Sequence, residues 1–357
     1  PFADKQPSVV KSFFFRFYTF LAKERWLGRM GIGGAHGYAD LWNNPALVRE
    51  ENGDMYAGLR VARLENSVGG DGADLITFAV DPARQDVPTN FRLGDTVQIY
   101  AYDAGDSEPN VARQFTLRGR IASLLPGEVK VLLSNAQRNL GVFEDECKVF
   151  ALEHDRVEAG NALLISGLYS LLKAPSEVQR RFLLHDAAEQ GTESVPSGDY
   201  GAFNRLVAKS VAAKELFLVI GPPGSGKTSR ALRYMVEEHL RLSSEGKLLL
   251  MAYTNRAVDE LCGMLEELIA DTPGLLADYL RLGSGISAAE SCRVRMMSSR
   301  VGQTLRSTDD VKQMMGEMRI IVGTISTMMR HTSLLSRLHI TAAFVDEASQ
   351  LLEPYLL

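Results

Sequence analysis

An apolar run that leads directly into a glycine-rich loop places the strongest constraint on how this chain can fold. Residues 216–228 read Leu-Phe-Leu-Val-Ile-Gly-Pro-Pro-Gly-Ser-Gly-Lys-Thr, so the run is followed by the pattern G-x-x-x-x-G-K-T. This order predicts a buried strand over 216–220, then a loop, then the first turn of a helix. The alternative is an ordinary glycine-rich turn, which the preceding apolar run and the following helix-forming residues disfavour.

The predicted loop has the composition of a phosphate-binding loop. Its candidate cofactor-binding residues are Gly221, Pro222, Pro223, Gly224, Ser225, Gly226, Lys227, Thr228 and Ser229. The glycines let backbone N–H groups turn inward on a polyphosphate, Lys227 reaches the β- and γ-phosphates, and the Thr228 hydroxyl ligates Mg²⁺. The sequence therefore predicts that the chain binds a nucleoside triphosphate together with Mg²⁺.

A second polar motif follows an apolar run near the end of the sequence. Residues 342–345, Ala-Ala-Phe-Val, lead into Asp346, Glu347, Ala348, Ser349 and Gln350. An acidic residue at the carboxyl end of a strand beside a phosphate loop completes the Mg²⁺ site, a role we expect for Asp346. Glu347 suits a general base that polarises the attacking water. The alternative for the acidic pair is a solvated helix start, and Gln350 fits a first-turn helix residue equally well.

Hydrophobic periodicity divides the chain into four regions. Residues 201–357 alternate strands and helices as in a parallel α/β sheet, with strands at 216–220, 247–252, 319–322 and 342–345. Residues 56–155 contain short strands at 59–64, 75–80, 96–102, 114–123, 129–133 and 148–152, a spacing typical of a small closed barrel. Residues 156–200 predict a stalk of two helices, 158–173 and 176–186, with a polar linker at 191–199. Residues 1–55 are predicted to form a helical connector or the tail of an upstream domain.

The amino-acid composition limits the possible domain number, membrane contact, metal sites and mode of nucleic-acid binding. The 357 residues are 45% hydrophobic, enough for packed cores in at least two domains. The apolar segment 13–21 is interrupted by Arg16 and too short to span a bilayer, so we expect a cytoplasmic protein without membrane contact. Cys147, Cys262 and Cys292 lie far apart in sequence, which predicts no disulfide framework and no metal site beyond Mg²⁺. The net charge of −5 means that any nucleic acid must bind in a local groove.

The glycine cluster at 31–37 invites comparison with a dinucleotide-binding loop. No strand precedes it, and its third glycine falls out of register for G-x-G-x-x-G, so we expect an ordinary loop. At the other end, Leu357 comes soon after the acidic strand of an unfinished sheet. We therefore expect further chain beyond it, and the absence of an initiator methionine before Pro1 predicts the same at the start.

Four motifs in order resemble helicase superfamily 1, in the branch of the nonsense-mediated-decay RNA helicases and the replication nuclease-helicases. They are G-P-P-G-S-G-K-T at 221–228, A-Y-T-N-R-A-V-D-E-L at 252–261, V-G-T-I-S-T at 322–327 and D-E-A-S-Q at 346–350. The resemblance implies an α/β fold with a RecA-like ATP-binding lobe, in which Lys227, Asp346, Glu347 and Gln350 are catalytic. It also implies that the barrel and stalk are accessory parts of that lobe.

The same resemblance implies partners and further site residues. Thr254, Asn255 and Thr324 would contact single-stranded DNA or RNA, although Thr254 and Asn255 alone more often form a helix cap. Asn204 would lie at the adenine, yet Val207 stands where the family has a glutamine. A second RecA-like lobe, and an upstream nuclease in the replication nuclease-helicases, would lie outside this sequence.

Two functional classes remain open from the sequence. The first is an ATP-driven motor fragment that moves along a single strand, on DNA and 5′ to 3′ by resemblance. The second is a nucleotide-gated nucleic-acid-binding switch without unwinding activity. A GTPase or small-molecule kinase is disfavoured because no D-x-x-G pattern follows the acidic strand and the sequence contains no guanine-reading N-K-x-D pattern.

Overall fold

A computed structural model of the chain describes most of its residues, in two compact units. The described residues are 5–31, 37, 39, 43–67, 72–82, 89–106, 108–155, 159–184, 191–193, 195–222, 224–300 and 308–357. One unit comprises residues 1–19 and 160–357, and the other comprises residues 20–159. Pro223 and most of the glycine cluster at 31–37 lie outside the described residues, as do residue 158 of the first predicted stalk helix, residues 185–186 of the second, and Ser194 of the predicted linker. The domain boundaries expected from sequence stay predictions.

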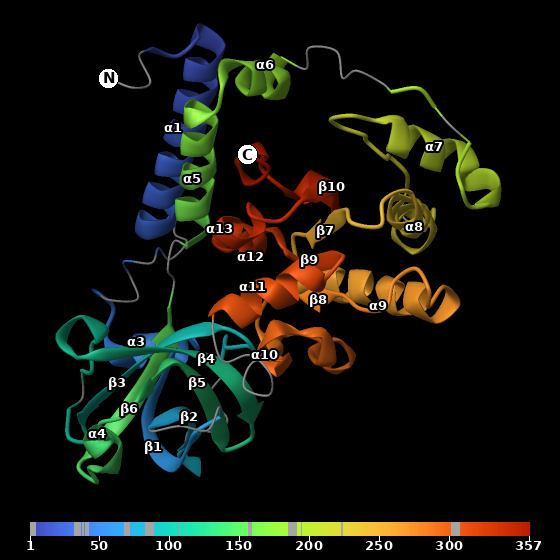
Figure 1. Cartoon of the computed structure of the whole chain (residues 1–357). Helices are drawn as coiled ribbons and strands as arrows, with labels where there is room; N and C mark the ends of the chain where they lie inside the picture. Colours follow the sequence, from blue (N-terminus) through green and yellow to red (C-terminus); the bar gives the residue numbers. More distant parts are fainter. Residues whose placement is uncertain are drawn as a thin grey trace. The chain divides into compact units, whose positions relative to one another are not determined.

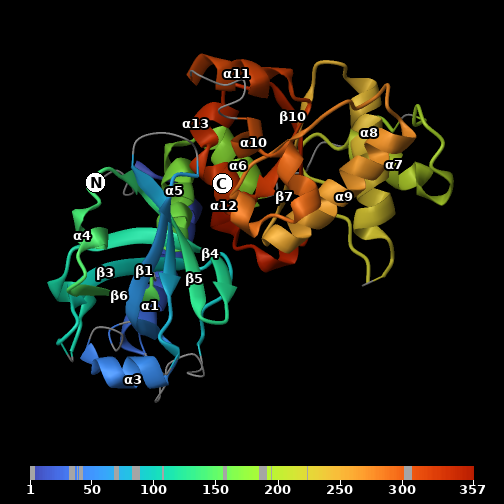
Figure 2. The same ribbon diagram turned by 90° about the horizontal axis from the view of Figure 1, so that it is seen from below.

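The second unit contains a closed antiparallel barrel, as the strand spacing predicts. Its strands are β1 (Met55–Glu65), β2 (Ala73–Ala79), β3 (Thr96–Asp103), β4 (Thr116–Leu125), β5 (Glu128–Gln137) and β6 (Lys148–His154). They follow the order β1-β2-β5-β4-β3-β6, and pairing of β1 with β6 closes the barrel (Figure 2). Alternate side chains such as Ile76, Phe78 and Ile121 fill the interior. Pro126 and Gly127 form the tight turn between β4 and β5, in which Gly127 has a φ of 77°.

A buried ion pair fastens a short helix to this barrel. Arg49 of α3 (Ala46–Glu51) donates to the Glu153 carboxylate on β6 and, at 2.6 Å, to the carbonyl of Pro109. The Tyr100 hydroxyl donates to the same carboxylate. Burial raises the pKa of Glu153, while Tyr100 and Arg49 oppose that rise. Because the pair is desolvated, loss of either partner would leave an uncompensated buried charge.

The first unit contains a parallel sheet of four strands among the described residues. They are β7 (Lys247–Ala252), β8 (Leu280–Arg281), β9 (Ile320–Thr324) and β10 (Ile340–Val345), in the order β10-β7-β9-β8. Three match predicted strands, whereas β8 is two residues long and was not predicted from the sequence. The parallel α/β arrangement is confirmed.

Helices cover both faces of this sheet. In Figures 1 and 2, α8 (Arg233–Leu242) and α9 (Asn255–Asp271) lie on one side, and α12 (Ile325–Arg330) lies on the other. The remaining helices of this region are α7 (Asn204–Ala212), α10 (Met297–Arg300), α11 (Thr308–Glu317) and α13 (Thr332–Leu335). Alternate residues of β7 explain the layering, because Leu248 and Leu250 enter the α8–α9 core while Leu249 and Met251 pack toward the other cluster.

The strand predicted at 216–220 is not formed, which corrects the sequence-based expectation. The segment still alternates: Phe217 and Val219 pack against the core, while Leu218 and Ile220 are 68% and 94% exposed. A strand exists only where a neighbour supplies its hydrogen-bond ladder, and within the described residues β10 pairs with β7 alone. The apolar pattern predicted which side chains face the core, but pairing depends on a neighbouring strand.

A helical pair also belongs to the first unit. The beginning of α1 (Ser8–Met30) runs beside α5 (Ala159–Lys173), where the Phe14 and Tyr169 rings lie 5.4 Å apart (Figure 1). Gln179 of α6 (Ser176–Leu184) donates to the carbonyl of Leu171 at 2.9 Å. A Cβ at Gly167 would lie 2.0 Å from the Pro354 carbonyl oxygen, so α5 needs glycine there. Among the described helices, none has both the length and the apolar character for a bilayer crossing.

Candidate nucleotide-binding site

The glycine-rich loop turns into a helix by way of two left-handed residues. Gly224 and Gly226 have φ of 78° and 79°, conformations that glycine adopts without steric cost. From Gly226 the chain enters a π-helical turn, η5 (Lys227–Leu232), in which the N–H of Ala231 donates to the Gly226 carbonyl at 3.0 Å. This turn continues directly into α8. The predicted order of loop and helix is therefore what the structure contains.

Contacts within the loop hold Lys227 over it. The Lys227 ammonium donates to the carbonyls of Gly221 and of Pro222, the latter at 3.0 Å. A Cβ at Gly221 would lie 2.8 Å from the Ser225 hydroxyl, so the first glycine permits a close backbone approach. Lys227 is thus a compact positive charge at the centre of the loop, suited to a phosphate.

A hydrogen bond joins the loop to the acidic motif. The Thr228 hydroxyl donates to the Asp346 carboxylate at 2.9 Å, and both side chains are half-buried. Thr228 is the second residue of η5, and Asp346 comes directly after β10. A hydroxyl and a carboxylate are oxygen ligands of the kind that Mg²⁺ takes, with water and phosphate oxygens completing the shell. The donor set therefore fits a Mg²⁺–nucleotide complex.

Glu347 is held in an unusual backbone conformation. At φ 53° it is the non-glycine residue with positive φ among those described. Its N–H donates to the Asp346 carboxylate at 3.0 Å, and its own carboxylate accepts from the Gln350 amide at 2.7 Å. Such strain persists where surrounding contacts fix it and is concentrated at functional sites. Gln350 is the last residue of the 3₁₀ turn η8 (Ala348–Gln350), and its side chain contacts Glu347 through this hydrogen bond.

The predicted nucleic-acid contacts lie at the ends of two adjacent strands. Ala252 of β7 is paired with Thr324 of β9, so both strands end at the same edge of the sheet. The Thr254 hydroxyl accepts from the Ala257 N–H at 3.2 Å, and the Thr324 hydroxyl accepts from the Thr327 N–H at 3.3 Å. Both threonines cap the helices that follow, which is the alternative considered for Thr254. Asn255 is exposed on the first turn of α9.

The residues expected near an adenine have other partners. The Asn204 amide oxygen accepts from the Tyr200 N–H at 2.7 Å, and its nitrogen donates to Asp199 at 3.0 Å. Hydrogen bonds from the Gly201 N–H and from Asn204 lower the pKa of Asp199. Val207 is fully buried in the core of the lobe. Its side chain packs inside the protein, where it offers no polar group to a base.

Sequence reasoning missed Glu238, which anchors the segment before α7. Its buried carboxylate accepts from the N–H groups of Ser197 and Gly198, at 2.6 and 3.2 Å, and from the Tyr200 hydroxyl at 2.8 Å. Burial alone would raise the pKa of Glu238, but these hydrogen bonds hold it below its usual value. Glu238 lies on α8, the continuation of the phosphate-loop helix. The pair Glu237-Glu238 resembles a solvated helix face, so the sequence carries no clear signal of this role.

Within the described part of the chain, no group of three or more histidine, cysteine or acidic residues is arranged to hold a metal. The Thr228 and Asp346 pair is a different kind of site, because Mg²⁺ bound to a nucleotide takes most of its ligands from phosphate and water.

Comparison with known proteins agrees with this geometry. Residues 204–354 match a family described as an AAA domain. The chain is 28% identical over 150 residues to the DNA replication ATP-dependent helicase/nuclease JHS1 of Arabidopsis thaliana, a match that covers 42% of this chain and 10% of that protein. The match thus spans about a tenth of the relative's length. Together, the two similarities support a helicase-like P-loop family for this chain.

Proposed function

We propose that this chain carries the ATP-binding lobe of an ATP-dependent nucleic-acid helicase or translocase. The observation that carries the proposal is the contact between Thr228 and Asp346, which unites the phosphate loop with the acidic motif. The similarity to an AAA domain and to a replication helicase/nuclease supports the same class. The finer assignment, to superfamily 1 and a RecA-like lobe, rests on the four motifs.

Each residue of the candidate site would have a separate role in ATP hydrolysis. Thr228 and Asp346 would hold Mg²⁺, which when bound neutralises charge on the phosphates. The loop from Gly221 to Ser229 cradles those phosphates, and Lys227 adds a fixed positive charge. Glu347 accepts a proton from the attacking water. Gln350, bound to the Glu347 carboxylate at 2.7 Å, orients that base and senses the γ-phosphate.

The sheet offers a short route between hydrolysis and the nucleic-acid strand. β7 lies between β10 and β9, so the residues that follow these strands occupy the same sheet edge. Asp346 donates its backbone N–H to the Met251 carbonyl at 2.8 Å, near the end of β7. A shift of Glu347 and Gln350 during hydrolysis would therefore be transmitted to Thr254 and Thr324 through the neighbouring strand ends.

We infer single-stranded DNA as the track and 5′ to 3′ as the direction. The DNA assignment is supported by the name of the relative, a DNA replication helicase/nuclease, and the direction by the motif resemblance alone. Hydroxyl and amide groups contact phosphates without reading base sequence, so sequence-independent binding is expected. A second RecA-like lobe and a nuclease domain would be parts of the whole protein beyond this sequence.

A nucleotide-gated binding switch is the second candidate. It would use the same Mg²⁺–nucleotide site and the same nucleic-acid contacts as the motor. In both cases the bound nucleotide must alter the conformation of the residues at this edge of the sheet. The switch differs from the motor because its ATP hydrolysis would not accelerate when a nucleic-acid strand binds. The intact set of Lys227, Thr228, Asp346 and Glu347 favours the motor.

The direct test is coupling between nucleotide and strand. Fluorescence anisotropy would measure the affinity of the chain for a labelled single strand, with Mg²⁺ and a non-hydrolysable ATP analogue and without them. We expect the nucleotide to change the affinity of the wild-type chain and to leave that of Lys227→Ala unchanged. Lys312→Ala, an exposed lysine of α11, is the matched control. Equal affinity in all conditions, or preference for duplex, would reject the proposal. In the whole protein, strand-stimulated ATP turnover separates the motor from the switch.

A further inference from the structure

The segment after β8 is fastened to α9 by two rows of facing residues. The segment forms the 3₁₀ helix η7 (Glu290–Arg295). The α9 row is Asp259, Cys262 and Glu266, and the facing row is Ala289, Cys292 and Arg295. Spacings of three and four residues place each row on one side of its helix. The two rows therefore meet in three successive pairs.

The first and third pairs are held by hydrogen bonds and charge. The Ala289 N–H donates to the Asp259 carboxylate at 3.1 Å. Arg295 donates to both oxygens of Glu266, at 2.8 and 2.9 Å, in the forked geometry of arginine and carboxylate. These contacts fix the register of η7 against α9 on both sides of the middle pair.

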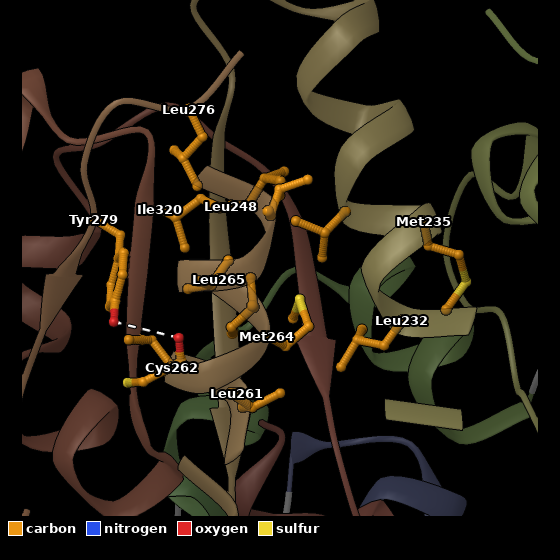
Figure 3. Close-up of a cluster of buried hydrophobic side chains, with 14 of the residues drawn as sticks. Leu232, Met235, Leu248, Leu261, Cys262, Met264, Leu265, Leu276, Tyr279 and Ile320 are labelled. Atoms are coloured by element: carbon orange, nitrogen blue, oxygen red, sulfur yellow. Dashed lines mark hydrogen bonds between the residues drawn. The ribbon is translucent and has the colours of Figure 1, made fainter. Parts of the chain in front are cut away.

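The middle pair consists of two buried thiols. Cys262 is fully buried and Cys292 is 5% exposed, and both belong to the same hydrophobic core cluster. Figure 3 draws Cys262 on α9 beside Tyr279, whose hydroxyl lies 3.5 Å from the Cys262 carbonyl oxygen. Burial raises the pKa of Cys262 to about 12, the Cys292 thiol adds to this rise, and Arg281 opposes it. The flanking contacts at Asp259 and Glu266 and the shared core place the two cysteines opposite each other, although the sequence predicted no pairing among the cysteines.

We propose that Cys262 and Cys292 form a thiol pair that closes to an intramolecular disulfide when a small peroxide reaches it. The less buried Cys292 attacks the peroxide O–O bond first, giving a sulfenic acid and releasing water. The Cys262 sulfur then attacks the Cys292 sulfur, so that the S–S bond forms, the S–O bond breaks and a second water leaves. Two electrons pass from the two sulfurs to one peroxide.

The disulfide would staple η7 to the body of α9. Closing the loop between the two cysteines restricts the unfolded chain, so the folded chain gains stability. Because α9 begins at Asn255, the staple also fixes the helix that follows the predicted strand contacts. The inference rests on the packing of this region and does not depend on the proposed helicase function.

Peptide mapping tests the proposal. The folded chain would be treated with hydrogen peroxide, its remaining thiols alkylated, and its non-reduced digest analysed by mass spectrometry. We expect the Cys262–Cys292 peptide as the main intramolecular link, with one of the three thiols, Cys147, still able to react. We also expect thermal unfolding to shift upward by roughly 5–10 °C and to return on reduction.

Matched variants assign the bond. Cys147→Ser should keep the link and the shift, whereas Cys262→Ser and Cys292→Ser should lose both. The wild-type chain oxidised in urea should give mixed links that include Cys147, because the register set by Asp259 and Glu266 is then absent. The proposal is overturned if Cys262 and Cys292 both remain alkylatable at a peroxide concentration that oxidises Cys147. It is equally overturned if links through Cys147 dominate in the folded chain.

Discussion

Glu347 combines backbone strain with a fixed side chain. Its φ of 53° is unusual for a residue with a Cβ, and its carboxylate is held by Gln350 at 2.7 Å. Its neighbour Asp346 accepts a hydrogen bond from Thr228. Adjacent carboxylates therefore have different partners, which suits one to a metal and the other to proton transfer.

Replacing that base should separate binding from hydrolysis. In the whole protein, Glu347→Gln keeps the shape of the side chain but loses the proton acceptor, so ATP should still bind while turnover falls at least about a hundredfold. Single-turnover hydrolysis with Mg²⁺ measures the loss, and nucleotide affinity is measured in parallel. Glu353→Gln, an exposed acid nearby, serves as the control. Unchanged turnover would remove Glu347 from this role.

Selectivity between purines provides a second prediction at this scale. Val207 is buried, and the Asn204 amide is occupied by Tyr200 and Asp199, so the structure offers no glutamine-like contact at this position. A two-point contact to a base edge is typically worth about 1–3 kcal/mol. We therefore expect kcat/KM for GTP within about tenfold of that for ATP in the whole protein. An ATP preference above about a hundredfold would mean that other groups read the adenine.

At the scale of elements, alternation and turn residues predicted most of what forms. The barrel strands and β7, β9 and β10 were predictable because each has its own apolar pattern and bounding turns. The segment 216–220 has that pattern too, but a strand also needs a paired neighbour, which its own residues do not encode. The two-residue β8 is too short to show periodicity. Glu238 and the Cys262–Cys292 pair depend on contacts between distant segments, which local spacing does not reveal.

The acidic anchors of η7 predict a pH-dependent stability. Arg295 lowers the pKa of Glu266 below its usual value. Burial would raise the pKa of Asp278, but Arg300 and Arg295 bring it below normal. Groups with lowered pKa values stabilise the fold above their unfolded values, 4.5 and 3.8, and this contribution disappears as the pH falls further.

The Glu266→Gln variant isolates one of these contributions. Urea unfolding should show the wild-type chain more stable than the variant at pH 6, by about 1 kcal/mol or less because Glu266 is partly exposed. The difference should shrink as the pH falls from 4.5 toward 3. Glu260→Gln, on the exposed side of the same helix, should show little difference at any pH. A gap that persists unchanged at pH 3 would contradict the ionic origin of the contribution.

At the scale of the whole molecule, the sequence contains one phosphate loop and one acidic motif. Phosphoryl transfer without an arginine finger from another lobe loses roughly 10³-fold or more. We therefore expect residues 1–357 alone not to unwind a duplex but to bind single strands weakly and with little sequence preference. The affinity should fall steeply with salt, because phosphate contacts release counterions. A strand-displacement assay and a salt titration check this, and unwinding by the chain alone would contradict the assignment.

The central claim is that the phosphate loop and Asp346 form one Mg²⁺–nucleotide site. Titration of the 357-residue chain with a fluorescent ATP analogue, in Mg²⁺ and in EDTA, measures it directly. We predict that Mg²⁺ tightens binding by at least about tenfold in the wild-type chain and in the exposed-acid control Asp309→Asn, and far less in Asp346→Asn. The same Mg²⁺ dependence in Asp346→Asn as in the wild-type chain, or no nucleotide binding at all, would contradict the account.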